Sequence, residues 1–200
     1  MHGTSLCVPC ACSFDGPTEV RRQLLTDGPP THALGAYRDS ARTTVLSFKE
    51  RGRRDLAQPL GRILAAVLPT LDDAEPHDGV WWLVPAPSRP SAARRRGGSH
   101  MLALARATAA ALAVKQVPAV VAPALRLARG TKDSAGLSAV ERIENLRGRV
   151  KVDPRGAPPP GTTSILLDDV VTTGATVVAC RDALQSSGIE VSAALTLTAT

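Results

Sequence analysis

The sequence predicts an α/β fold with a parallel sheet and helices on both of its faces. Residues 80–84 and 165–167 are short, continuous apolar runs between polar residues, a pattern typical of strands that are buried on both faces. Apolar residues of helical period lie before and between these runs, as in residues 56–67. Because strands that alternate with helices form parallel sheets with right-handed crossovers, we expect this architecture over most of the chain.

The expected elements follow one another in a single succession. Residues 1–35 form a loose lead-in with a partial cysteine knuckle, and residues 36–200 form one domain that is long enough to bury a core. The domain is expected to contain, in order, a strand at 42–48, a helix at 56–67 despite its early Pro59, an acidic loop at 71–79, a strand at 80–84, a helix at 100–114, a strand at 124–128, a short helix at 138–146, a connector rich in Pro and Gly at 155–161, a strand at 165–167, a helix closed by Gly188, and a last strand.

Charge and composition favour an anionic partner and a soluble protein. The 200 residues carry a net charge of +6 and a pI near 9.7. A basic protein attracts polyphosphates as well as nucleic acid, so charge alone leaves both classes open. The chain has no apolar run long enough for a membrane helix and no signal-like start, so we expect a cytoplasmic protein without a membrane partner.

The four cysteines are unevenly placed, with Cys7, Cys10 and Cys12 near the start and Cys180 far away. In a reducing cytosol we expect no disulfides. Cys7 and Cys10 are one half of a zinc knuckle, so a Zn²⁺ site would need Cys12 and His2 as improvised further ligands. The alternative is a remnant or an unstructured start. Cys180 falls on the apolar face of the helix expected there, which favours core packing over chemistry.

The most informative segment comes directly after the second apolar run. It begins with Asp168 and Asp169 and continues with Val171, Thr172, Thr173, Gly174, Ala175 and Thr176. At the carboxyl end of a parallel strand, hydroxyls, small residues and the amides of a helix start bind phosphate. Adjacent carboxylates accept hydrogen bonds from a vicinal diol or hold a divalent cation through water. Together these features describe a site for a ribose 5-phosphate.

Simpler roles exist for single residues of this segment. Asp169 or Thr172 would serve as an ordinary helix cap, and Asp168 as a solvated strand end. A cap, however, needs one such residue and not a run of six. The ligand-binding interpretation therefore explains more of the segment.

This segment resembles the signature with which type I phosphoribosyltransferases bind phosphoribosyl pyrophosphate (PRPP), with Ser164 where an apolar residue is usual. Over nearly the whole chain the sequence is similar to the ComF family of phosphoribosyltransferase-like proteins. The matching residues are Cys7 with Cys10, Tyr37 with Phe48 and Lys49, residues 85–89, Arg95 to His100, Arg142 with Asn145, and the signature itself. The family's usual Arg-Gly-Phe-Asn-Gln differs here at Gly98 to His100, and Ser134 stands where Gln is common. The resemblance implies a Rossmann-like type I phosphoribosyltransferase fold.

The resemblance also implies a donor site and a reaction. Asp168 and Asp169 would bind the ribose hydroxyls, with Mg²⁺ held mainly through the substrate nearby, and the segment from Val171 to Thr176 would bind the 5-phosphate. Pyrophosphate would be bound by Ser88 and Arg89, with Arg96 and Lys132 as weaker candidates. The implied reaction transfers phosphoribose to an unidentified nitrogen acceptor with release of pyrophosphate. The family's association with competence loci implies a link to the DNA-uptake machinery.

Several charged residues keep two interpretations. The arginines at 94–96 are either a solvated charge run or ligands of pyrophosphate, and His100 is either a helix-start or surface residue or part of the acceptor site. Tyr37 and Lys49 are assigned mostly to packing and solvent. No convincing general base is found, and neither a P-loop nor the spacing of a catalytic triad is present.

The main alternative function is a non-catalytic module that senses PRPP or contacts DNA through residues 89–96. Two Trp, one Tyr and two Phe are few for stacking on single strands, which weakens the DNA interpretation. A partner subunit that keeps the fold without catalysis is a third interpretation.

Overall fold

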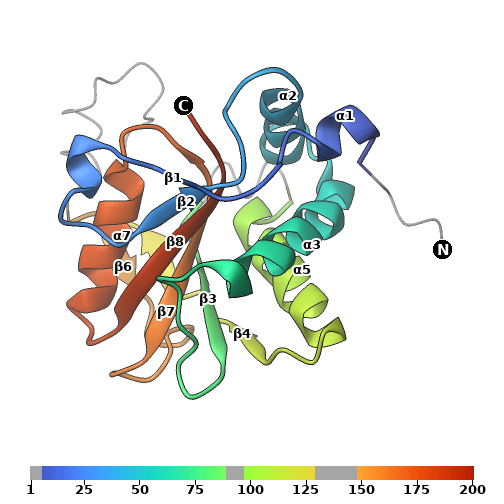
Figure 1. Cartoon of the computed structure of the whole chain (residues 1–200). Helices are drawn as coiled ribbons and strands as arrows, with labels where there is room; N and C mark the ends of the chain where they lie inside the picture. The colour runs from blue at the N-terminus through green and yellow to red at the C-terminus, as the bar shows by residue number, and fades with distance from the viewer. Residues whose placement is uncertain (1–5, 89–96, 129–147) are drawn as a thin grey trace.

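The computed structural model describes residues 6–88, 97–128 and 148–200. Within these ranges the chain forms a six-stranded sheet in the order β1-β2-β8-β7-β3-β4 and a separate two-stranded sheet (Figure 1). The strands of the main sheet are β1 (Thr18–Glu19), β2 (Thr31–Ala33), β3 (Trp81–Pro85), β4 (Ala119–Val121), β7 (Thr163–Val171) and β8 (Glu190–Ala199). All neighbours in this sheet are parallel except β1, which pairs antiparallel with β2.

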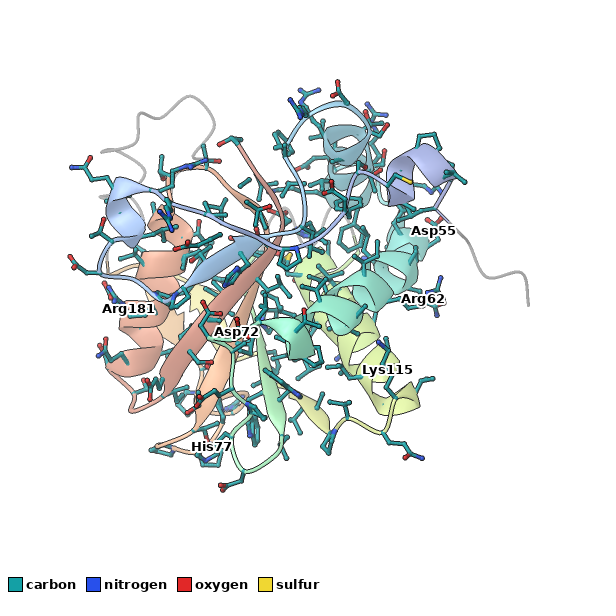
Figure 2. The ribbon with its side chains drawn as sticks, in the orientation of Figure 1. Asp55, Arg62, Asp72, His77, Lys115 and Arg181 are labelled. Atoms are coloured by element: carbon teal, nitrogen blue, oxygen red, sulfur yellow. The ribbon has the colours of Figure 1, made fainter. Side chains whose placement is uncertain are left out.

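Helices cover both faces of this sheet, as the sequence predicts. Figure 1 shows α2, α3 and α5 on one side and α7 on the other. The α-helices are α1 (Val8–Ala11), α2 (Asp39–Lys49), α3 (Ala57–Val67), α5 (His100–Val114) and α7 (Ala175–Gln185), and the short 3-10 helices are η1 (Gln23–Leu25), η2 (Arg54–Leu56) and η3 (Leu68–Thr70). The antiparallel pair β5 (Leu125–Leu127) and β6 (Val150–Val152) packs on the same side as α7. The outer surface is charged: Arg62 on α3 and Lys115 after α5 are exposed (Figure 2).

Two apolar cores follow from the alternation of side chains along the buried strands. Leu83 and Leu167 pack into the core that α2, α3 and α5 cover. Val84 and Leu166, their neighbours along the chain, pack into the core that α7 covers. The continuous apolar runs that predicted these strands are therefore explained by burial on both faces of a parallel sheet.

Several predicted elements are confirmed. The helix predicted at 100–114 is α5, the apolar stripe at 56–67 lies on α3, and the last strand is β8. Pro59 is tolerated because it is the third residue of α3, where a backbone N–H has no partner within the helix. Gly188, with φ of +73°, lies in the turn between α7 and β8. The short helix predicted at 138–146 lies outside the described residues.

Two predictions about the first half of the chain are wrong, and a third, about the middle, is confirmed for the strand itself but not for its place in the parallel sheet. Residues 18–33 are not a loose lead-in, because β2 joins the sheet beside β8 and Leu25 of η1 is buried. Residues 42–48 are helical and not a strand: the buried positions 41, 44, 45 and 48 of α2 have helical spacing. The strand near 124–128 exists as β5 but pairs antiparallel with β6, and the main sheet ends instead with β4.

The boundary between β3 and β7 is a special position in the sheet, because the connections on its two sides run in opposite directions. From β3 the chain moves outward to β4 on one side, and from β7 it moves to β8 on the other. The order of the strands therefore reverses between β3 and β7. In α/β sheets, ligands bind outside the carboxyl ends of the strands at such a switch point. No helix in the described ranges combines the length and the apolar character needed to cross a lipid bilayer.

Candidate functional site

The predicted carboxylates lie at this switch point, near the end of β7. The strand is longer than the sequence predicts, since it continues to Val171. Asp168 and Asp169 are thus part of the strand, paired along β8, and do not follow its end. Both are buried, with exposed fractions of 8% and 3%. They are therefore not solvated strand ends.

The two carboxylates face opposite sides of the sheet, because side chains alternate along a strand. Asp169 continues the row of Leu167, and its carboxylate is bonded to residues of α2 and α5. Asp168 continues the row of Leu166, and its charge acts on the thiol of Cys180 in α7. Adjacent residues in the sequence are thus separated into two different environments.

Asp169 is the centre of a buried cluster of charged groups. Lys49 Nζ lies 3.0 Å from Asp169 Oδ1 and 2.9 Å from Oδ2. His100 Nε2 lies 2.7 Å from Oδ2. The side chain of Lys49 is 36% exposed, whereas those of Asp169 and His100 are 5% and 7% exposed. Both carboxylate oxygens are therefore occupied by protein groups.

Helix ends bring the two partners of Asp169 to the edge of the sheet. Lys49 is the last residue of α2 and His100 is the first residue of α5. Ser99 caps α5, since its hydroxyl accepts a hydrogen bond from the backbone N–H of Leu102 at 3.2 Å. The His100 ring also meets the Phe48 ring edge-on, with 5.6 Å between centroids and 75° between planes. These contacts hold the imidazole in one orientation.

The two carboxyl groups have opposite pKa shifts. Burial opposes ionisation of Asp169, but Lys49 and His100 outweigh it and hold the pKa of Asp169 well below its usual value. Burial and the neighbouring charge of Asp169 raise the pKa of Asp168 to about 7. Burial opposes protonation of Lys49, yet the Asp169 carboxylate raises the pKa of this amine. Burial also raises the pKa of the Cys180 thiol, which packs in the core as the sequence predicts.

The loop after β7 has the features of an anion-binding loop. Gly174 precedes α7 with φ of +88°, a conformation that favours glycine. A Cβ at Gly174 would lie 2.7 Å from the side chain of Leu25, so the site also has no space for a side chain. Among the described residues, no acceptor bonds the backbone N–H groups of Thr172, Thr173 and Gly174. Within the described part of the chain, these three N–H groups at the start of α7 are therefore not used by other hydrogen bonds of the protein, and such groups can bind an anion.

The other residues of the loop differ in exposure. The Thr172 side chain is exposed, those of Thr173 and Thr176 are half-buried, and Val171 and Ala175 are buried. The Thr173 hydroxyl accepts a weak hydrogen bond from the Ala175 backbone N–H at 3.4 Å. Threonine hydroxyls are thus available beside the unbonded amides.

Arg22 anchors this loop from a segment that the sequence did not associate with the site. Its Nε donates to the Thr172 carbonyl at 3.0 Å, and its guanidinium also donates to the Thr200 carbonyl. Thr200 in turn donates its backbone N–H to the Val171 carbonyl at 3.0 Å. The hairpin of β1 and β2 is therefore tied to the loop after β7. Arg22 also lines a groove of about 590 Å³ along this hairpin, which contains none of the predicted site residues.

Of the residues predicted to bind pyrophosphate, Ser88 is the one that the structure describes. It follows β3 on the other side of the switch point, and its hydroxyl lies 3.2 Å from the Ser99 hydroxyl. Between them, a Cβ at Gly97 or Gly98 would meet the Arg54 guanidinium at 3.2 or 3.1 Å. Arg89, Arg96 and Lys132 lie outside the described residues, as do the arginines at 94–95.

Sequence reasoning missed two members of the site. Lys49 was assigned mostly to packing and solvent, and His100 either to a helix start or the surface or to the acceptor site. His100 is indeed the start of a helix, but its ring is buried against Asp169. No local pattern links positions 49, 100 and 169. The linking information is the fold itself, which brings two helix ends to one strand.

The described residues do not form the predicted zinc site. Cys7 and Cys12 are exposed, Cys10 is half-buried, and all the cysteines are free. In the ranges that the structure describes, no group of three or more His, Cys, Asp or Glu residues is arranged to hold a metal ion. His2, the improvised ligand, lies outside those ranges.

Neither the models of protein families nor the curated protein sequences contain a match to this chain.

Proposed function

We propose that this protein binds PRPP with Mg²⁺ and transfers its phosphoribosyl group to a nitrogen acceptor with release of pyrophosphate, as its resemblance to the ComF family suggests. One observation carries the proposal. A loop whose amides have no acceptor among the described residues lies at the start of α7, shortly after a pair of buried carboxyl residues and at the switch point of a parallel sheet. A phosphate site beside a diol site matches a ribose 5-phosphate.

The loop after β7 is suited to the 5-phosphate. The amides of Thr172, Thr173 and Gly174 supply hydrogen-bond donors, and the positive end of α7 favours a negative charge. The Thr173 and Thr176 hydroxyls supply further donors. Gly174 and Ala175 carry no large side chain of their own that would cover the backbone amides.

Asp168 is the better placed of the two carboxyl groups for the ribose diol. Among the described residues, the Asp168 carboxyl accepts one hydrogen bond, to Oδ1 from the Asp169 backbone N–H at 2.8 Å, and these residues leave its further acceptor positions open. Asp169, by contrast, has both oxygens bonded by Lys49 and His100. The proposal therefore assigns Asp168 to direct contact with the ribose and Asp169 to the positioning of other groups.

Mg²⁺ fits this arrangement as a substrate-bound ion. Mg²⁺ in phosphate enzymes is held largely by substrate oxygens and water, with few protein ligands. Asp169 is not a metal ligand in this proposal, because its oxygens are occupied. The ion would lie on the pyrophosphate and ribose oxygens, where it would neutralise the leaving group.

Residues of the chain would also stabilise the negative charge that develops on the pyrophosphate during the reaction. Breaking the bond from C1 to pyrophosphate gives an oxocarbenium-like ribose and a departing polyanion. Ser88, at the end of β3, and the Lys49 ammonium, at the same edge of the sheet, are the described groups suited to bind that polyanion.

Calorimetric titration of PRPP with Mg²⁺ tests the donor site. The wild type should bind, and Asp168→Asn/Asp169→Asn should lose most of the binding. Gly174→Ala should also weaken binding by about 10-fold or more, because it both strains φ and forces the loop against Leu25.

Gly161→Ala is the matched control. Gly161 has the same φ of +88°, but nothing lies within 4 Å of its Cβ position. It should bind PRPP as the wild type does. Absence of binding by the wild type, or equal binding by all variants, would reject the donor site. Binding without pyrophosphate release in a screen of amines and bases would assign PRPP sensing in place of transfer.

A further inference from the structure

His100 has one ring nitrogen that the protein leaves unused. Nε2 is bonded to Asp169 at 2.7 Å, while Nδ1 is buried without a hydrogen-bond partner in the described part of the chain. A buried polar atom without a partner costs about 1–3 kcal/mol. Such exceptions are rare in folded proteins, and a catalytic role or an absent ligand commonly explains them.

The bond to Asp169 decides which nitrogen carries the proton. An ionised carboxylate only accepts hydrogen bonds, so Nε2 of His100 must be the donor. In the neutral ring Nδ1 then carries the lone pair. The unused atom is thus a hydrogen-bond acceptor of fixed orientation, and it can receive a proton.

Three contacts hold this acceptor in place. Lys49 bonds both oxygens of Asp169 and so fixes the carboxylate that orients the imidazole. Phe48 fixes the ring from its edge. A base oriented by a buried carboxylate is the arrangement by which many enzymes activate a nucleophile.

The position of His100 connects it with the rest of the site. It opens α5 next to Ser99, whose hydroxyl lies 3.2 Å from that of Ser88 at the end of β3. Asp169 connects it with β7, on the opposite sheet face from Asp168. The ring therefore belongs to the same edge as the proposed donor site but faces away from the diol-binding carboxyl.

We propose that His100 Nδ1 is the general base that removes a proton from the acceptor. As the acceptor atom bonds to C1, the C1–O bond breaks and its electron pair leaves with pyrophosphate, while the acceptor's proton moves to Nδ1. Asp169 stabilises the resulting imidazolium, which returns the proton to solvent after the product leaves. This inference rests on the proposed function.

Two probe nucleophiles separate a base from a structural residue. Pyrophosphate release from PRPP with Mg²⁺ is measured in water alone and with added azide, an anion that attacks without losing a proton. His100→Gln should slow the reaction with water by about 10²-fold or more, which is the usual contribution of a general base. The azide-dependent rate should stay within about 3-fold of the wild type, because no proton has to be removed.

His32→Gln is the control. His32 is also bonded to a carboxylate, Asp73, at 3.0 Å, but it lies on β2 outside the proposed site. Both of its rates should equal those of the wild type. Binding of PRPP to each variant, measured by calorimetry, shows that the donor site is folded.

The outcomes distinguish this inference from the function on which it rests. Failure of the wild type to bind PRPP would reject both. If His100→Gln lowered the water-dependent and the azide-dependent rates equally, His100 would have a structural role and would not be the base. If it lowered neither rate, His100 would have no role in the reaction. A wild type that binds PRPP but releases pyrophosphate with neither probe would also reject the base, while the donor site would stand.

Discussion

The two sides of the sheet at the end of β7 receive adjacent carboxyl groups and treat them in opposite ways. On the side of α2 and α5, Asp169 is bonded by Lys49 and His100, and its pKa is lowered. On the side of α7, Asp168 accepts a hydrogen bond from the Asp169 backbone N–H and acts on the buried Cys180 thiol. Its pKa is raised to about 7. The surroundings of Asp169 stabilise its negative charge, whereas the surroundings of Asp168 disfavour a negative charge.

This difference shows how a pair of acids divides two tasks. The Asp169 carboxylate stabilises the fold and orients its neighbours. Ionisation of Asp168 lowers the stability of the folded protein. Such a cost is common at residues that bind a ligand and do not stabilise the fold. A diol or a substrate-bound cation would supply Asp168 with partners beyond the one backbone N–H that the described residues give it.

Replacing each acid in turn should change stability in opposite directions. Asp169→Asn leaves the Lys49 charge without its counter-ion and should lower the free energy of unfolding by about 2–3 kcal/mol, less than for a fully buried pair because Lys49 can turn to solvent. Asp168→Asn removes a disfavoured charge and should raise it by about 1 kcal/mol at pH 8. Urea denaturation of the three proteins measures both effects.

A third variant makes the first comparison interpretable. Asp182 lies on α7 with a side chain that is 58% exposed, so Asp182→Asn should change stability by less than about 0.5 kcal/mol. If Asp168→Asn and Asp169→Asn were destabilising to the same degree, the division of tasks between the two faces would be wrong.

The pH dependence of stability should reveal Asp168 in particular. Its raised pKa means that the native state binds more protons than the unfolded state between about pH 4 and pH 7, so its contribution falls as pH rises through that window. Asp169 acts the other way, since its lowered pKa gives stability above about pH 4 that is lost in acid.

Denaturation at pH 5 and pH 8 isolates this contribution. The wild type should lose about 2 kcal/mol more than Asp168→Asn over this interval, because the variant has no carboxyl group to ionise at position 168. Parallel pH dependence of the two proteins would mean that Asp168 titrates in the ordinary acidic range, and the assignment of a disfavoured charge would fail.

Three of the six strands of the main sheet, β3, β7 and β8, and the anion loop could be predicted from local sequence, because their patterns are local. Buried strands need continuous apolar residues, and α5 needs a capping serine followed by an apolar face, so β3, β7 and α5 were found. The two- and three-residue strands β1 and β2 were missed because so few residues show no period. The strand predicted at 42–48 is part of α2, whose buried positions have helical spacing.

The site was only half predictable for the same reason. The residues from Asp168 to Thr176 are consecutive, so their chemistry is visible in one segment. Lys49 and His100 are separated from Asp169 by 120 and 69 positions. Each is an isolated charged or titratable residue at a helix end, and the sequence alone assigned Lys49 mostly to packing and solvent and left the role of His100 open. Two helices packed on one sheet face make them neighbours of the same carboxylate.

A second histidine–carboxylate pair gives the smallest expected effect and tests the role of burial. His32 Nε2 lies 3.0 Å from both oxygens of Asp73, but the two side chains are 14% and 36% exposed. Because water can replace either partner, Asp73→Asn should lower the free energy of unfolding by less than about 1 kcal/mol. His100→Gln, which disturbs a buried pair of the same chemistry, should cost about 1–3 kcal/mol in the same measurement. Equal losses would mean that bonding to a carboxylate, and not the burial of Asp169 and its link to Lys49, sets the energy of these pairs.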